Sequence, residues 1–294
     1  MRILICSNGT PAADNASRLG ALLAAACHAE TTLLGIAEKP VDETPLRAAL
    51  EAEAERLRAA GVTPRIVIGA GEPIREIQKE TSVGHYDLAI IGAERKGSTG
   101  LYWRSRRTYE AIKAIAPPVL VAIGPCQRFK RFLVCTGGKK FIADALRLTG
   151  QLAAAVGASV TLLHVMAEPP AIYADLVQLE EDLERLLASG SELGVNLSRQ
   201  KKDLEDLGVP ADVRVRHGLV LEKVLQEARI GEYDLIVTGS SQARGVVRHY
   251  IMGDLTRSIV NRADCPVLVA RSGPIPSSGN IFQALKNLFA VTRD

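Results

Sequence analysis

Short apolar segments recur along the chain and are separated by longer stretches with helical spacing. In the first half these segments lie at about residues 2–7, 31–37, 64–68, 87–91 and 119–123. They are apolar throughout rather than alternating, which is typical of parallel strands covered by helices on both faces. Between the first two, Leu19, Leu22, Leu23 and Ala26 share one face of a predicted helix. This alternation predicts a doubly wound α/β fold with a five-stranded parallel sheet.

The same blocks occur twice, in the same order. The matching pairs are 2–10 with 131–139, 31–38 with 160–168, 85–93 with 232–240, and 117–124 with 265–272. Cys6 is opposite Cys135, and Tyr86–Asp87 is opposite Tyr233–Asp234. The chain is therefore a duplicated domain. We predict two tandem α/β domains, residues 1–125 and 126–273, followed by a linker and helix at 274–294.

The second copy is longer than the first. The matched cysteines are 129 positions apart and the matched tyrosines 147, so the second copy gains 18 residues between its second and third strands. The gain lies in residues 169–208, whose Leu and Val spacing predicts a longer helix, opened or kinked near Ser189–Gly190. We expect the last strands, 118–123 and 266–271, to pair as a pseudo-dimer within the chain, which leaves neither edge open. A further homodimer is a separate hypothesis.

Doubly wound sheets bind ligands beyond the carboxyl ends of their strands, so the loops after each strand are the candidate sites. The segment after the fourth strand of the second copy, GSSQARGVVRHYIMGD at 239–254, starts and ends near a glycine. Such glycines allow backbone N–H groups to approach phosphate oxygens, and a helix N-terminus adds its dipole. The spacing therefore suggests a phosphate-binding loop.

These residues and the ending CPVLVAR, whose PVLVA also occurs in the first copy, make the chain similar to tandem universal stress proteins over about residues 1–125 and 126–273. The resemblance implies a flavodoxin-like or Rossmann-like sheet in each copy. It also implies, in nucleotide-binding members, Gly-x2-Gly-x9-Gly followed by Ser or Thr, and an Asp after the first strand that meets adenine. Family members often dimerise through the last strand.

In the second copy the resemblance carries over only in part. Gln242 stands where the second glycine belongs, there is one extra residue before Gly253, and Asp254 replaces the hydroxyl. An ionised carboxylate accepts but does not donate hydrogen bonds, and it repels phosphate. Asp254 is interpreted as an N-cap of the next helix, as one ligand of a bridging Mg²⁺, or as neither of these. The candidate ATP or AMP site comprises Thr136, Gly137, Val165, Gly239, Ser240, Gln242, Arg244, Gly253, Asp254 and Leu255.

The first copy departs further from the pattern. Arg95 stands at the second glycine and Asn8 replaces the adenine-contacting Asp, although an amide still offers a donor and an acceptor. The weaker candidate site there comprises Ser7, Asn8, Gly92 and Arg95. His164, at the end of a strand, is interpreted as a structural histidine rather than a base-stacking one.

Composition, charge and cysteine spacing limit the classes of function that fit the sequence. The 36 basic and 33 acidic residues give a net charge of +3, which does not demand a nucleic-acid partner. Five cysteines without CxxC spacing predict reduced thiols, and no leader or apolar run long enough to span a membrane is present, so we expect a cytoplasmic protein. No pattern of catalytic or metal-binding residues is evident. We expect no enzyme, or at most a weak ATP hydrolase.

Two functional hypotheses remain. One is a stress-response regulatory module that senses adenine nucleotide through the second copy; the other is a protein-interaction or chaperone-like scaffold that binds no nucleotide. Two segments are candidate protein-binding surfaces: the basic stretch 95–107 around Trp103, and a helix with an apolar stripe at Ile281, Phe282, Leu285, Leu288 and Phe289. The basic stretch also suits a solvated helix face, with Trp103 packed between the copies.

Overall fold

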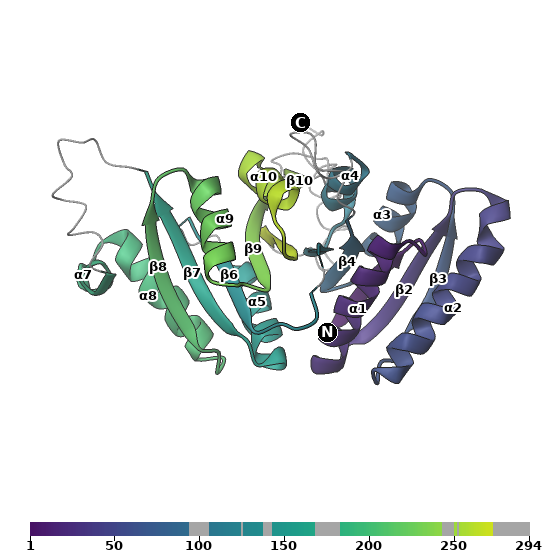
Figure 1. Cartoon of the computed structure of the whole chain (residues 1–294), viewed down its shortest axis with the longest axis horizontal. Coiled ribbons are helices and arrows are strands. Elements are labelled where there is room, and N and C mark those ends of the chain that lie inside the picture. The colour runs from purple at the N-terminus through teal and green to yellow at the C-terminus, as the bar shows by residue number, and fades with distance from the viewer. Residues whose placement is uncertain are drawn as a thin grey trace, which may run out of the picture.

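The computed structural model describes residues 1–93, 106–124, 126–137, 143–167, 183–242, 250–251 and 253–272. Its strands form one sheet in the order β3-β2-β1-β4-β5-β11-β9-β6-β7-β8, with the short β10 paired to β9 (Figure 1). The first five are β1 Arg2–Ser7, β2 Glu30–Ala37, β3 Arg65–Ala70, β4 Leu88–Gly92 and β5 Val119–Ala122. The others are β6 Arg131–Cys135, β7 Ser159–Met166, β8 Ala211–His217, β9 Leu235–Gln242, β10 Tyr250–Ile251 and β11 Val267–Ser272.

Each half of this sheet contains five parallel strands in the same order, so the duplication and the doubly wound fold predicted from the sequence are confirmed. The halves join where β5 pairs with β11 antiparallel, with Val119 opposite Val269 and Val121 opposite Val267. This is the pairing predicted for 118–123 and 266–271.

Helices cover both faces of the sheet (Figure 1). The lower face in that view carries α1 Pro11–Ala26, α2 Glu43–Ala59, α5 Ala143–Val156 and α8 Glu192–Glu205. The upper face carries α3 Pro73–Val83, α4 Arg106–Ala114, α9 Val220–Ile230 and α10 Asp254–Arg262. The 3₁₀ turn η1 Pro40–Asp42 precedes α2, and the short α7 Leu183–Ala188 precedes α8.

Two hydrophobic cores result, one on each face, and each extends through both halves. Alternate residues of β1 divide between them: Ile3 and Ile5 face the lower core and Leu4 the upper core. Because both cores continue across the β5–β11 junction, the two halves share their hydrophobic cores and pack as a single unit.

One expected core residue lies elsewhere. Leu19 and Leu23 of α1 are buried, as predicted, but Leu22 is 40 % exposed. It lines a groove between α1 and α2 instead of contacting the sheet. The stripe of α1 that faces the sheet is therefore narrower than the sequence indicated.

The extra residues of the second half form a broken helical segment, as predicted. The break falls between α7 and α8, where Gly190 has φ +65°. Ser191 then caps α8, because its hydroxyl accepts a hydrogen bond from the N–H of Gly194 (3.1 Å). Residues 168–182 lie outside the described part of the chain.

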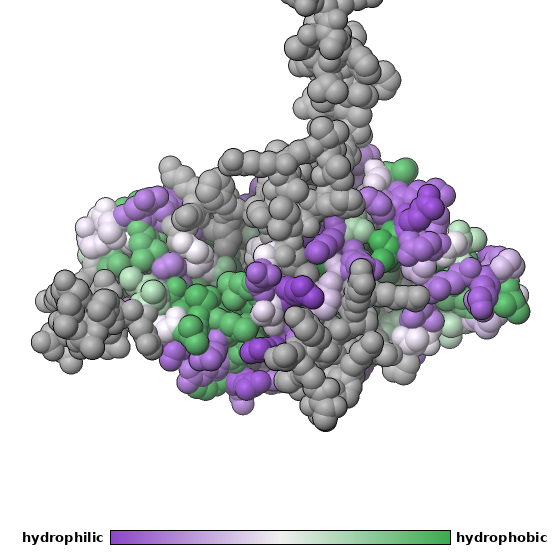
Figure 2. Space-filling model, turned by 90° about the horizontal axis from the view of Figure 1, so that it is seen from above, coloured by the Kyte–Doolittle hydropathy of each residue, from purple (hydrophilic) through white to green (hydrophobic). Residues whose placement is uncertain are grey.

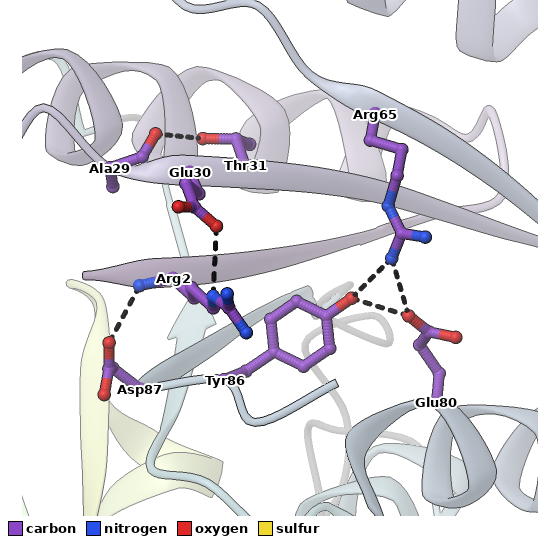
Figure 3. Close-up of polar contacts among 8 residues, drawn as sticks. All are labelled: Arg2, Ala29, Glu30, Thr31, Arg65, Glu80, Tyr86 and Asp87. Atoms are coloured by element: carbon purple, nitrogen blue, oxygen red, sulfur yellow. Dashed lines mark hydrogen bonds and ion pairs between the residues drawn. The ribbon is translucent and has the colours of Figure 1, made fainter. Parts of the chain in front are cut away.

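The repeated Tyr–Asp pair closes the amino end of each half. Asp87 Oδ2 accepts a hydrogen bond from the backbone N–H of Arg2 (2.8 Å), at the start of β1 (Figure 3). In the second half Asp234 Oδ2 accepts from the N–H of Arg131 (3.0 Å). The aspartates thus join the fourth strand of each half to the first, on the edge away from the predicted sites.

The tyrosine of each pair accounts for the glycine two residues before it, because the tyrosine ring fills the space that a side chain would need. A Cβ at Gly84 would lie 2.1 Å from the Tyr86 ring, and one at Gly231 would lie 2.2 Å from the Tyr233 ring. Tyr86 in turn donates its hydroxyl to Glu80 (2.6 Å), which also pairs with Arg65 (3.2 Å; Figure 3). This repeated Gly-x-Tyr-Asp motif is structural.

Arg271, at the end of β11, connects the second half to a helix of the first. Its side chain is almost fully buried, at 3 % exposure. The guanidinium donates to the backbone carbonyls of Ile112, Ile115 (2.8 Å) and Pro117 (3.2 Å), at and just beyond the carboxyl end of α4. A cation suits this position because a helix C-terminus carries partial negative charge and unpaired carbonyls.

We expect Arg271→Met to lower the free energy of unfolding by about 2–4 kcal/mol, because it leaves buried carbonyls without donors. Urea denaturation measures this loss. The matched control is Arg229→Met, which removes only an exposed ion pair with Asp264 and should change stability by less than about 1 kcal/mol. Equal losses in the two variants would contradict the role given to Arg271.

Candidate functional site

The carboxyl ends of the strands lie at opposite edges of the sheet in the two halves. This follows from the antiparallel junction, since β11 and its four parallel neighbours run against β5 and its neighbours. We call the region beyond the carboxyl ends of β1 and β4 the first-half cleft, and the corresponding region beyond β6 and β9 the second-half cleft. Each must be judged from its own residues.

In the second-half cleft, two glycines fourteen positions apart come together. Gly239 lies in β9, and Gly253 occupies the N-cap position of α10. Thr256, in the first turn of α10, donates its hydroxyl to the carbonyl of Gly239 (2.7 Å) and lies 3.0 Å from the hydroxyl of Thr238. This buried contact fixes the N-terminus of α10 against the end of β9.

The N-cap role interpreted for Asp254 is wrong. The helix begins at Asp254, and Gly253 before it is extended (φ −59°, ψ 159°) and takes the cap position. Asp254 is exposed in the first turn, where its negative charge interacts favourably with the helix dipole. The N–H groups of the first turn have no partner within the helix, which is the usual property of an anion-binding helix end.

Three other predicted residues lie on the neighbouring strands of this edge. Thr136, directly after β6, is buried, and its hydroxyl donates to Gln200 Oε1 (3.0 Å). Gly137 follows it with open space where a Cβ would point, and Val165 is partly buried on β7. The side chain of Thr136 is thus engaged within the protein, whereas Gly137 leaves room at the surface.

His164 Nδ1 lies 2.9 Å from the carbonyl oxygen of Thr136, so this histidine holds the loop after β6 to β7. That contact agrees with the structural role favoured by the sequence. Gly71 and Gly218, at the matching turns after β3 and β8, have φ values of +128° and +126°. Such values favour glycine, so these residues serve the turns.

The other predicted residues lie on β9 and α10 or outside the described part of the chain. Ser240, Gln242 and Leu255 lie within β9 or α10, but only Leu255 has a described side chain, which is 39 % exposed. Arg244 lies outside the described residues, as do Arg95 and the rest of residues 95–105 in the basic stretch. The predicted helix in 274–294 also lies outside them.

The first-half cleft contains a cavity of about 360 Å³, lined by Ser7, Asn8 and Gly92 among others. Ser7 donates its hydroxyl to Glu53 Oε1 (2.6 Å). Asn8 Oδ1 accepts from the hydroxyl of Thr10 (2.7 Å), so its carbonyl oxygen belongs to a turn before α1. The structure brings these three predicted residues together and adds Glu53, which the sequence analysis missed.

The 147-position offset between the copies could have identified Glu53, because it aligns Glu53 with Gln200. The contact of Ser7 with Glu53 then corresponds to the contact of Thr136 with Gln200. A hydroxyl at the end of the first strand thus contacts a polar side chain in both halves. That side chain is a carboxylate in the first half and an amide in the second.

The described residues of these clefts include neither an ionised thiol nor a metal centre. Burial raises the pKa of Cys6 and of Cys135 to about 12, so both thiols, at the ends of β1 and β6, are neutral at pH 7. Within the described ranges no group of three or more His, Cys, Asp or Glu side chains is arranged to hold a metal ion. All five cysteines are free thiols.

We expect Thr256→Val, which keeps the side-chain shape, to lower the free energy of unfolding by about 1–2 kcal/mol. The cause is the loss of the donor to Gly239 in a buried setting. Thermal and urea unfolding measure the change, with Ser258→Ala on the half-buried side of α10 as the control. If the two variants are equally stable, Thr256 does not fix the helix end.

In a comparison with known protein families, residues 128–271 match the universal stress protein family. A curated relative is the universal stress protein MJ0531 of Methanocaldococcus jannaschii, 24 % identical over 143 residues, which cover 49 % of this chain and 82 % of the relative.

Solved structures match nearly the whole chain. A universal stress protein from Archaeoglobus fulgidus superposes with a TM-score of 0.70 at 17 % identity, over 92 % of this chain and 98 % of that one. A putative universal stress protein from Pseudomonas aeruginosa gives 0.66 at 14 % identity, over 98 % and 97 %. At these identities the likeness establishes the fold. In the described residues, no helix is long and apolar enough to cross a membrane.

Proposed function

The chain belongs to the universal stress protein family through residues 128–271, and we propose that it is a cytoplasmic regulatory module of the stress response whose second-half cleft binds ATP or AMP. The observation that carries this proposal is the Thr256 contact, which holds Gly239 and Gly253 at the same edge of the sheet. The first-turn N–H groups of α10 then lie beside the end of β9, where an anion would be stabilised.

Each residue of the proposed site has a physical role. Gly239 and Gly253 allow the backbone to approach a phosphate, and Gly137 leaves space beside it. Val165 and Leu255 supply apolar surface for a base. Ser240, Gln242 and Arg244 are candidates for the remaining polar contacts. Asp254 lowers the affinity for bare phosphate, and Mg²⁺ between the two would offset that repulsion.

An interaction scaffold is the second candidate function, and an apolar rim favours it. Leu219 is 68 % exposed, and Val220 and Leu255 are each 39 % exposed, at the starts of α9 and α10. Figure 2 shows hydrophobic residues gathered over the second half, on the left of that view of the upper face. Exposed apolar patches of this kind are typical of protein-binding surfaces. The stretch 95–107 and the segment 274–294 remain further candidates for partner binding.

We expect ATP or AMP, with Mg²⁺, to raise the melting temperature of the full chain. Ligand at a hundredfold excess over Kd stabilises a folded protein by roughly 2.7 kcal/mol. A melting temperature that none of these ligands changes would remove the nucleotide proposal and leave the scaffold.

Asp254→Ser tests the role of the carboxylate in the same assay. We expect its affinity for AMP to rise about tenfold, because a repulsive charge becomes a hydrogen-bond donor. Asp203→Ser, an exposed site on α8, makes the same change in net charge away from the cleft and should leave the affinity unchanged. No gain in Asp254→Ser would show that Asp254 does not face the phosphate.

A further inference from the structure

The first-half cleft has the size and lining of a small-molecule site. Its cavity of about 360 Å³ falls in the usual range of ligand pockets, about 300–1,000 Å³. The lining is largely aliphatic: Leu34, Ile36, Ile74, Ile77 and Ile91. The Cys6 thiol adds a neutral surface at the end of β1. These side chains would favour an apolar body rather than a polyanion.

Glu53 lies behind this cleft and is only 3 % exposed. Both of its oxygens accept hydrogen bonds, Oε1 from Ser7 (2.6 Å) and Oε2 from Ser17. Among the described residues no cation pairs with it. Glu53 also lines the groove between α1 and α2 together with Arg18 and Arg56, but both arginines pair with Asp14.

A buried carboxylate held only by hydroxyl groups leaves a net negative potential around it. Ser7 lines the cavity and donates its hydroxyl proton to Glu53, so a single residue separates the carboxylate from the cleft. The Ser7 oxygen also accepts a hydrogen bond from the N–H of Gly9 (3.2 Å). Ser7 therefore has no proton left to donate to a phosphate, whereas the negative charge behind it favours a cation.

Two further carboxylates line the cavity. Glu72 accepts from the N–H groups of Ile74 (3.1 Å) and Arg75 (2.9 Å), so it occupies the donors at the start of α3 that an anion would otherwise use. Glu38 also lines the cavity and has other contacts of its own. The main argument rests on Glu53, and these two residues add to the local acidity.

The second half shows whether this fold requires acidic residues at these positions. The repeat aligns Glu53 with Gln200 and Glu72 with Leu219. Both carboxylates thus have uncharged counterparts on the same fold. The acidity of the first-half cleft is a property of that cleft and is not required by the architecture.

We propose that the first-half cleft binds a small organic cation, with an ammonium group near Ser7 and an aliphatic or aromatic body on the isoleucine-rich lining. This site is separate from the nucleotide site proposed in the second half. The ligand class follows from an apolar cavity behind which Glu53 lies buried, paired with no cation among the described residues.

Three probes with one ring system test the proposal on the unmodified chain: tryptamine (cation), tryptophol (neutral) and indole-3-acetate (anion). Calorimetric titration should give tryptamine an affinity roughly tenfold above tryptophol, with the anion weakest, as expected for one charge interacting at close range. Methyl NMR should show shifts at Ile77 and Ile91, which line the cavity. Absence of tryptamine binding, or equal binding of cation and anion, would overturn the proposal.

The matched variants are Glu53→Gln and Glu55→Gln, both on α2. The first introduces the amide that the second half uses at this position, and it should reduce the preference for tryptamine over tryptophol to about twofold. Glu55 is exposed and pairs with Arg58, so its variant should keep the full preference. Equal preferences in both variants would contradict the role of Glu53. AMP binding should be the same in both, so failure here leaves the nucleotide proposal standing.

Discussion

The antiparallel pairing of β5 with β11 is the interaction on which the rest of the structure depends. A five-stranded open sheet has two edges with unpaired N–H and C=O groups, and an open edge invites association. Pairing the two last strands removes one edge from each half and continues both hydrophobic cores across the junction. Arg271 adds a buried polar contact at the same place, between β11 and the end of α4.

The same pairing limits how two chains can associate. The strands that remain at the ends of the sheet are β3 and β8, and both carry charged residues: Arg65 on β3, and Asp212, Arg214 and Arg216 on β8. Charged side chains on edge strands oppose edge-to-edge pairing. An association through the last strand is already satisfied inside the chain, so a homodimer would have to use another surface.

Much of the fold could be predicted because the chain repeats itself. Buried parallel strands must be apolar throughout, and matching blocks fixed both their number and their order. The break near Gly190 could be predicted because glycine interrupts a helix. The junction of the two halves could be predicted because unpaired edge strands tend to pair. The expectation that Leu22 packs with Leu19 and Leu23 was wrong. Helical spacing predicts an apolar stripe on α1 but not the width of that stripe, which depends on how α2 packs beside α1.

The candidate sites were less predictable, since they depend on contacts between residues far apart in sequence. Gly253 takes the cap position instead of Asp254 because of local backbone geometry that residue type alone does not fix. Glu53 is 46 positions from Ser7, and no local motif marks it. Only the alignment of the copies, with Gln200 in the corresponding place, distinguishes it from the three surface glutamates of α2.

Duplication within one chain also has a consequence for how each cleft can change. The described residues of the first-half cleft lie between Cys6 and Ala111, and those of the second-half cleft lie between Thr136 and Thr256. A substitution in one cleft therefore leaves the residues of the other unaltered, whereas both halves share the β5–β11 junction. Each ligand site can diverge independently while the common core preserves the fold.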